Sequence, residues 1–279
     1  MSENEYSPPH RVKKFNVDQI KDAAAYFQEY GYVVFRNSFD VNQGERFWQD
    51  VEDALKSEVP LKFSHYGNIY TNPDVPLEGF KIPRIIDAET HIDSAREMML
   101  HPIVRSFLRE IYEGQEPTCL QTLTYKYSSE QGAHSDKSLV APPYASSYDR
   151  ETLVASWFAI EASDERNGAL VIYPGSHRLQ KRSIHDGFGD DYGAFVNHCI
   201  DVCLKAGSKP VAFRADAGDV LFWHGDFVHA GGPILAAQQQ PTRRSLVCHY
   251  ASIADGKESD DPHWERIPFK GASFFRARA

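Results

Sequence analysis

Cysteine is scarce in this 279-residue chain, and its spacing suggests no disulfide framework. The four cysteines are Cys119, Cys199, Cys203 and Cys248, and no two of them form a Cys-x-x-Cys pair. Cys199 and Cys203 are four residues apart, so they could share a helix face and bind a metal. Buried thiols in a reducing cytoplasm are the simpler interpretation, because free cysteine behaves as a small apolar residue.

Long apolar runs and blocks of basic residues are also missing. No stretch of about 18 apolar residues is present, so we expect no transmembrane helix and no membrane partner. Residues 1–9 are polar and lack the apolar segment of a secretory signal, which favours a cytoplasmic location. The net charge is −9 and no basic block accompanies it, so nucleic acid is not an expected partner.

Two common kinds of catalytic motif are absent as well. The chain has no supported Ser-His-Asp or Cys-His nucleophile arrangement and no Gly-rich phosphate loop. It does contain 42% hydrophobic residues, which is enough for a full core and excludes a disordered chain. Its length suits one large domain, so we expect a single domain over residues 1–279.

The first part of this domain, residues 1–115, is predicted to be mainly helical, with one strand. Asn16 and Gln19 form a capping-box-like pair at the start of a helix, which ends at Gly31. The predicted strand follows directly, at residues 31–36.

Two further helices are predicted at residues 42–56 and 94–112. Pro102 lies near the middle of the second, so this helix should kink or split in two. Residues 60–90 are rich in Pro, Asn, Asp and Tyr, and we interpret them as a loop.

Residues 116–255 have a different pattern, in which short apolar or alternating runs are separated by turn residues. The predicted strands are residues 120–127, 153–161, 169–173, 210–214, 219–223, 227–230 and 245–252. Together with the strand near residue 33, they indicate a mainly β fold with flanking helices: a cupin-like jelly roll, or double-stranded β-helix. One helix is expected at residues 192–206, and residues 256–279 are interpreted as a C-terminal tail.

A His-x-Asp pair, His134 and Asp136, is the main candidate for a metal site. On a strand, residues two apart point to the same face, so both side chains could bind one ion. His229 follows 95 residues after His134, where a strand and turn at residues 219–226 would bring it to the same ion. With twelve histidines, a His-x-Asp pair can arise by chance, so the late histidine and its context carry the argument. Two imidazoles and one carboxylate are the ligands of facial-triad iron(II) oxygenases, which leave positions open for O₂ and a co-substrate.

Arg243 and Ser245 come shortly after this histidine and suggest an anionic co-substrate. Arg243 lies fourteen residues beyond His229, and a planar guanidinium can bind a carboxylate through two hydrogen bonds. Ser245 is two residues on, on the same face of the predicted strand, and can add a hydroxyl donor. Arg244 is the alternative cation, but alternation with Ser245 favours Arg243.

Residues 119–250 resemble the phytanoyl-CoA dioxygenase family of iron(II)/2-oxoglutarate oxygenases. The resembling segments are Gly132-Ala-His-Ser-Asp136, Ala155-Ser-Trp-Phe-Ala159, Asn167-Gly-Ala-Leu-Val-Ile-Tyr-Pro-Gly-Ser-His177, Gly218-Asp-Val-Leu-Phe-Trp223, Val228-His-Ala-Gly231 and Arg243-Arg-Ser-Leu-Val-Cys-His-Tyr250. The N-terminal helix followed by Gly31-Tyr-Val-Val-Phe35 resembles the opening of the family too. The chain departs from the family pattern in a longer stretch before the arginine, at residues 235–241.

The resemblance implies a double-stranded β-helix with iron(II) held by His134, Asp136 and His229. It also implies that 2-oxoglutarate chelates the iron through its 1-carboxylate and 2-oxo group, with its 5-carboxylate on Arg243. Related halogenases have Ala or Gly in place of the aspartate, so Asp136 indicates hydroxylation or another oxidative C–H reaction.

Two more residues are candidates for contact with the co-substrate. Trp157 lies where the family has an aromatic residue beside 2-oxoglutarate, although an isolated strand tryptophan could equally be a core residue. Gln131, three residues before His134, could reach a 2-oxoglutarate carboxylate, but a loop amide facing water is the simpler interpretation.

The expected activity is oxidation of a small molecule, with two alternatives left open. One is a non-oxidative metal cupin, such as an isomerase or lyase, and the other is a jelly roll that only binds a small molecule. The Arg243-x-Ser245 pair favours the first activity, because it suits a dicarboxylate co-substrate. The segments expected at the mouth, residues 60–90 and 137–148, mix Tyr, Pro and charge and indicate no single substrate class.

Overall fold

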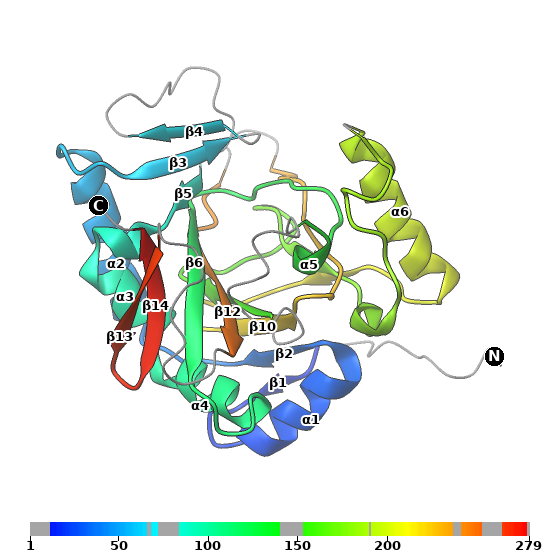
Figure 1. Cartoon of the computed structure of the whole chain (residues 1–279), viewed down its shortest axis with the longest axis horizontal. Helices are drawn as coiled ribbons and strands as arrows, with labels where there is room; N and C mark the ends of the chain where they lie inside the picture. The colour runs from blue at the N-terminus through cyan, green and yellow to red at the C-terminus, as the bar shows by residue number, and fades with distance from the viewer. Residues whose placement is uncertain are drawn as a thin grey trace.

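Two β-sheets of unequal size form the centre of the protein, and helices lie around them (Figure 1). The computed structural model describes residues 12–65, 68–71, 84–139, 153–189, 191–236, 241–252 and 264–277. Within these residues, no helix is long and apolar enough to cross a bilayer.

The larger sheet has eleven strands and takes them from both ends of the described chain. Its main path, in spatial order, is β1 (Lys14–Phe15), β2 (Tyr32–Phe35), β10 (Val220–His224), β7 (Val154–Ala159), β12 (Ser245–Ser252), β6 (Pro117–Tyr125), β5 (Arg84–Ile86), β3 (Lys62–His65) and β4 (Asn68–Thr71). The hairpin of β13 (Trp264–Phe269) and β14 (Ala272–Ala277) joins it through parallel pairing of β14 with β6.

The smaller sheet has three antiparallel strands. They are ordered β11 (His229–Gly231), β8 (Leu170–Ile172) and β9 (Val211–Phe213). Together the two sheets form the double-stranded β-helix that the sequence predicted. The seven strands predicted between residues 116 and 255 are all present, with ends shifted by up to three residues.

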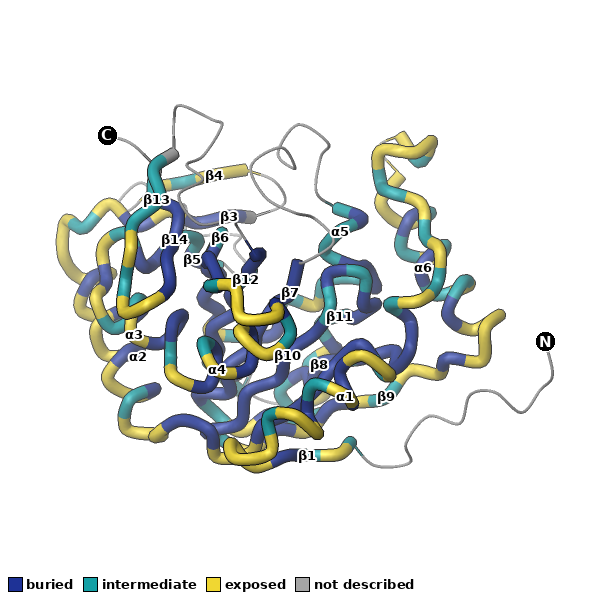
Figure 2. The backbone as a smooth tube through the Cα atoms, turned by 60° about the horizontal axis from the view of Figure 1, so that its bottom comes forward, coloured by how far each residue is buried: buried dark blue, intermediate teal, exposed yellow. Residues whose placement is uncertain are grey.

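Six α-helices accompany the sheets in the described residues. They are α1 (Ile20–Tyr30), α2 (Val41–Leu55), α3 (Asp93–Met99), α4 (Pro102–Ile111), α5 (Asp136–Leu139) and α6 (Tyr192–Lys205). Phe107 of α4 connects three elements, because its ring lies 5.4 Å from Phe27 of α1, 5.4 Å from Phe35 of β2 and 4.7 Å from Phe222 of β10. These contacts place α1 and α4 against the outer face of the larger sheet. Across the molecule from α2 and α3, α6 packs beside the smaller sheet (Figures 1 and 2).

Local sequence signals account for the helix ends. Asn16 donates its backbone N–H to Gln19 Oε1 at 2.9 Å, and Gly31 ends α1 in the left-handed conformation at φ 77°. Asp40 caps α2 by accepting a hydrogen bond from the backbone N–H of Asn42. The helix predicted at residues 94–112 is split into α3 and α4, because Pro102 has no N–H to continue the first of them.

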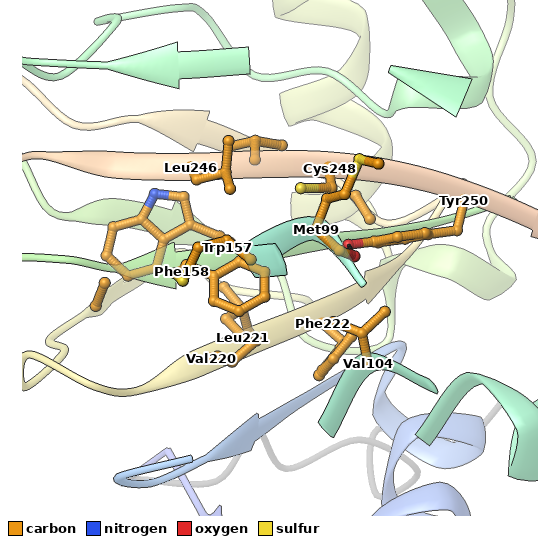
Figure 3. Close-up of a cluster of buried hydrophobic side chains, with 14 of the residues drawn as sticks. Met99, Val104, Trp157, Phe158, Val220, Leu221, Phe222, Leu246, Cys248 and Tyr250 are labelled. Carbon is orange, nitrogen blue, oxygen red and sulfur yellow. Dashed lines mark hydrogen bonds between the residues drawn. The ribbon is translucent and has the colours of Figure 1, made fainter. Parts of the chain in front are cut away.

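The core continues through the outer face of the larger sheet toward α3 and α4. Figure 3 shows Phe158, Phe222, Leu246 and other buried side chains of neighbouring strands packed with Met99 and Val104. The hydroxyl of Tyr250 donates to the carbonyl of Met99 at 2.7 Å, which satisfies a phenol that is fully buried.

Two sequence predictions about this part of the fold are wrong. The described part of residues 1–115 contains five strands instead of one, and β3, β4 and β5 lie within the predicted loop at residues 60–90. These strands have only three or four residues, which is too short for a clear alternation. They belong to the sheet because β5 pairs with β6, β3 with β5, and β4 with β3. Residues 66–67, 72–83 and 140–148 of the expected mouth lie outside the described residues.

The C-terminal tail is also more ordered than predicted, because it contains the β13–β14 hairpin. Lys270 and Gly271 form its turn, with φ values of 49° and 73°. Positive φ at both central residues is the requirement of a type I′ turn, which suits the twist of the two strands.

A buried carboxylate beside β6 gives the fold a pH dependence. Glu89, in the 3₁₀ turn Ala88–Thr90, is 2% exposed and accepts a hydrogen bond from Thr122 Oγ1. Burial raises the pKa of Glu89 to about 7, and the nearby Asp87 carboxylate adds to this increase. The folded protein therefore holds a proton that the unfolded chain would release at a lower pH.

We predict that Glu89→Gln changes how the free energy of unfolding depends on pH. Because the folded pKa is above the ordinary value of 4.5, wild-type stability falls as pH rises from about 4.5 to about 7 and then levels off. Glutamine does not titrate. The free energy of unfolding of the variant should therefore rise by about 1 kcal/mol or more relative to that of wild type between about pH 5 and 8. Urea unfolding at several pH values measures this, with Glu110→Gln on an exposed position of α4 as the control. Parallel curves for wild type and Glu89→Gln would contradict the prediction.

Candidate metal and co-substrate site

Two histidines and one aspartate converge between the two sheets. The Nε2 atoms of His134 and His229 each lie 3.7 Å from Asp136 Oδ1. One possible ligand atom from each residue lies within 4.8 Å of the other two, so the three side chains could hold a single ion. Among the described residues, this is the one such group of three or more His, Cys, Asp or Glu side chains.

A backbone bridge brings the two histidines together. The N–H of His134 donates to the carbonyl of His229 at 3.0 Å, and the reverse bond is 2.9 Å. Each Nδ1 atom also lies near a carbonyl oxygen, that of Gly132 for His134 and that of Phe227 for His229. Because a carbonyl can only accept, Nδ1 carries the proton in each ring and Nε2 is left as the free ligand atom.

The expected placement of His134 and Asp136 on one strand is wrong, although their side chains do meet. His134 belongs only to the isolated bridge with His229, and Asp136 is the first residue of the short helix α5. Between them, Ser135 is fully buried and its hydroxyl lies 2.6 Å from that of Ser138. This turn aims the carboxylate at the histidines without the two-residue alternation of a strand. By contrast, the expectation that His229 begins a return strand is confirmed by β11.

The charges of the group suit a metal cation. Burial lowers the pKa of His134 to about 4, and repulsion from His229 adds to this. Burial also lowers the pKa of His229, against the opposing effect of Asp136. Burial disfavours ionisation of Asp136, but the imidazoles of His229, His249 and His134 outweigh it and hold the pKa of its carboxyl well below the usual range. Near neutral pH the group therefore offers two neutral imidazoles and one carboxylate, the protonation states that metal binding requires.

Two residues beside Asp136 were not identified from the sequence. Trp223, the fourth residue of β10, donates its indole N–H to Asp136 Oδ2 at 2.7 Å. His249 of β12 has its Nε2 atom 3.5 Å from the same oxygen. Both come from the larger sheet, whereas His229 comes from the smaller one. The group therefore lies where the two sheets meet.

Arg243 and Arg244 point in opposite directions, as the predicted alternation requires. Arg243 is 2% exposed, and one of its terminal nitrogens donates to the carbonyl of Gly168. Its Nε atom has no hydrogen-bond partner in the described structure, and burial lowers its pKa to about 10. Arg244 instead forms ion pairs with Glu161 and Glu45, both at 2.7 Å. Arg244 therefore has carboxylate partners, whereas Arg243 has none among the described residues.

Two further buried donors lie on the same sheet face as Arg243. Ser245 Oγ and Trp157 Nε1 are buried and have no hydrogen-bond partner among the described residues. The guanidinium carbon of Arg243 lies 5.7 Å from the centre of the Trp157 ring. Trp157 pairs with Val247, two residues from both Ser245 and His249, so alternation puts all of these side chains on the inner face. Buried donors without acceptors are costly, and an anionic ligand would satisfy them.

Gln131 and Arg84 both lie near Tyr192. Burial raises the pKa of Tyr192 on α6, and the nearby Gln131 side chain opposes this increase. Arg84 is half-buried on β5. It donates to the hydroxyl of Tyr125 at 3.4 Å, and Tyr125 pairs with Ser245 across β6 and β12. Arg84 therefore extends the inner polar surface toward the edge strands.

A buried His-Asp-His group on a double-stranded β-helix, with an inner arginine that has no carboxylate partner among the described residues, is typical of facial-triad metal oxygenases. The model of the phytanoyl-CoA dioxygenase (PhyH) family matches residues 27–245. Because this match spans well over half of the chain, the protein belongs to the phytanoyl-CoA dioxygenase family.

The similar curated proteins are phytanoyl-CoA dioxygenases and one other dioxygenase among those compared. Peroxisomal phytanoyl-CoA dioxygenase of Bos taurus is 24% identical over 233 residues, which cover 81% of this chain and 66% of that protein. The Homo sapiens protein is 23% identical over 235 residues, which cover 81% of this chain and 67% of its own length. Dioxygenase aneA of Aspergillus aculeatus is 24% identical over 213 residues, which cover 74% of this chain and 64% of that protein. The chain thus spans about two thirds of the length of these relatives.

Solved structures with low sequence identity share the fold. The non-heme α-ketoglutarate-dependent epimerase SnoN from nogalamycin biosynthesis has a TM-score of 0.61 at 18% identity, and the match covers 94% of this chain and 99% of that one. The carbocyclase SnoK from the same biosynthesis has a TM-score of 0.62 at 18% identity, covering 88% of this chain and 92% of that one. EctD from S. alaskensis, solved with 2-oxoglutarate and 5-hydroxyectoine, has a TM-score of 0.62 at 14% identity. The match covers 93% of this chain and 82% of that one.

We predict that a divalent cation stabilises this protein through His134, Asp136 and His229. Mn(II) at about 100 times its Kd should add about 2.7 kcal/mol to the free energy of unfolding, because it binds only the folded state. His134→Ala and His229→Ala should each remove the increase in Tm, whereas His185→Ala at an exposed position should keep it. A cation-dependent increase that survives both site variants would place the metal elsewhere.

Proposed function

We propose that this protein is an iron(II)- and 2-oxoglutarate-dependent dioxygenase that hydroxylates a C–H bond of a small molecule. The observation that carries the proposal is the buried Arg243, which has no carboxylate partner among the described residues and shares a sheet face with His249 beside Asp136. A non-oxidative metal cupin, or a jelly roll that only binds a small molecule, would have no need for this cation.

His134, Asp136 and His229 would hold the iron on one side and leave three positions of an octahedral ion open. The bound iron(II) supplies the oxidative chemistry, in which 2-oxoglutarate and O₂ are converted to succinate and CO₂ while the substrate is oxidised. The protein's contribution is to orient these reactants and to exclude water from the space between the sheets.

Arg243, Ser245 and Trp157 would bind the far end of 2-oxoglutarate. The guanidinium can form two charge-assisted hydrogen bonds with the 5-carboxylate, and the Ser245 hydroxyl can add a third. The indole N–H of Trp157 is a further donor without a partner. These groups are buried before the ligand arrives, so binding satisfies donors that folding left unpaired. Gln131 stays a weaker candidate, since its side chain lies near the Tyr192 hydroxyl.

The presence of Asp136 supports hydroxylation, because a halogenase would need that coordination position for halide. The epimerase and carbocyclase among the structural neighbours show why the product must be identified directly.

We further propose a single domain over residues 1–279, since the larger sheet contains strands from both ends of the described chain. The four buried free cysteines support a reducing compartment such as the cytoplasm.

The proposed function predicts succinate formation that needs iron(II), 2-oxoglutarate and O₂ together. Purified protein should be incubated with these components, ascorbate and a panel of small metabolites, and succinate measured with the oxidised product. Turnover of 2-oxoglutarate without a primary substrate would already support the class. His134→Ala should abolish succinate formation, and His185→Ala should not. Tight 2-oxoglutarate binding without succinate under any condition would favour the binding-protein alternative.

We predict that Arg243→Ala weakens 2-oxoglutarate binding by about 10- to 1,000-fold, equivalent to about 1.4–4 kcal/mol. The cation-dependent increase in Tm should remain, because Arg243 does not contact the His-Asp-His group. Anaerobic titration of the iron(II) protein with 2-oxoglutarate measures the affinity. Arg244→Ala is the matched control, because it removes the neighbouring arginine whose partners are Glu45 and Glu161. If Arg244→Ala weakened binding and Arg243→Ala did not, the assignment of the two arginines would be wrong.

A further inference from the structure

The two carboxylate oxygens of Asp136 have different surroundings. Oδ1 faces the Nε2 atoms of His134 and His229, each at 3.7 Å. Oδ2 faces away from this pair and accepts the indole hydrogen bond of Trp223 at 2.7 Å. His249 Nε2 lies 3.5 Å from Oδ2, at the outer limit of a hydrogen bond. Oδ1 is therefore directed at the other two possible ligands, whereas Oδ2 accepts a hydrogen bond from a protein donor.

We propose that Trp223 is a positioning residue that keeps Asp136 a one-oxygen ligand. This inference rests on the proposed function, because it concerns how the iron site is held. A carboxylate can bind a metal through one oxygen or both, and binding through both would take one of the three positions left for 2-oxoglutarate and O₂. The indole N–H engages Oδ2 and so disfavours the two-oxygen arrangement.

Trp223 is itself held firmly enough for this role. It is 2% exposed and lies on β10, between β2 and β7, where its backbone pairs with Tyr32 and Ala155. Its ring centre lies 4.7 Å from that of His229, so one side chain contacts two of the three proposed ligands. An indole fixed by a central strand and by packing has little freedom to follow a rotating carboxylate. Groups that hydrogen-bond the ligands of a metal, and not the metal itself, usually orient those ligands in this way.

Trp223→Phe tests the proposal, because it removes the indole N–H and keeps an aromatic ring beside His229. The chain offers a matched control in Trp48→Phe. Trp48 is 5% exposed and donates its indole N–H to the Glu52 carboxylate at 3.0 Å, on helix α2. Both changes therefore remove a buried indole and one hydrogen bond to a carboxylate, and only one of them is at the proposed metal site.

Iron(II) affinity should be measured anaerobically, together with the charge-transfer absorption of the iron(II)–2-oxoglutarate complex. Trp223→Phe should weaken iron(II) binding by about 10- to 100-fold, as expected when a hydrogen-bond partner of a metal ligand is lost. It should also shift the absorption band, while the Tm of the metal-free variant stays close to that of Trp48→Phe. Iron(II) affinity and an absorption band equal to those of Trp48→Phe would overturn the role of Trp223. Absence of iron(II) binding by the wild-type protein would overturn both this inference and the proposed function.

A measurement on the wild-type protein keeps the proposal testable if Trp223→Phe does not fold. The chain has four tryptophans, so ¹⁵N-tryptophan labelling gives at most four indole N–H signals. The signal of Trp223 is assigned by its contacts with the His229 ring, and Zn(II) is added as a diamagnetic probe. The indole proton should resist exchange with solvent both before and after Zn(II) binds, because Oδ2 remains its acceptor. Rapid exchange after Zn(II) addition would show that Oδ2 had moved to the metal, and the inference would be wrong.

Discussion

The backbone bridge between His134 and His229 is the interaction on which the candidate site depends. Two hydrogen bonds, of 3.0 and 2.9 Å, join a segment without regular structure to the first residue of β11. They place two imidazoles side by side before any ion is present, with ring centres 4.4 Å apart. The site then needs only a carboxylate aimed into the same space, and the turn that starts α5 supplies it. Most of the conformational entropy that the metal ligands must lose is therefore lost when the sheets fold, before a metal binds.

The larger sheet contributes the opposite half of the site. Its inner face carries polar side chains that would be costly in an ordinary core, including a nearly fully buried arginine. The outer face of the same strands is apolar and packs on α1, α3 and α4 (Figure 3). This difference between the two faces of one sheet separates stability from function. The outer face provides the burial that stabilises the fold, and that stability compensates for unpaired donors on the inner face.

Those parts of the structure that depend on periodicity could be predicted from the sequence. The strands of the jelly roll, the position of His229 after a strand and turn, and the opposite directions of Arg243 and Arg244 all follow from alternation along single strands. The contact of Trp223 with Asp136 joins residues 87 positions apart, so no local pattern indicates it. The turn at Asp136 was missed because the His-x-Asp spacing fits a strand and a turn equally well. Strands β3 to β5 were missed because their few residues acquire a strand conformation only by pairing.

The β13–β14 hairpin has a practical consequence for where this protein can be cut. The region that matches the family ends at residue 245, yet the larger sheet continues to Ala277. In Figure 1 the hairpin lies beside β6, and β14 pairs with Thr118 and Cys119 of that strand. A shortened version designed on the family boundary would lose most of β12 as well, including His249 beside Asp136. The boundary of the recognisable family sequence and the boundary of the folding unit are therefore different, and only the second is a safe place to truncate the chain.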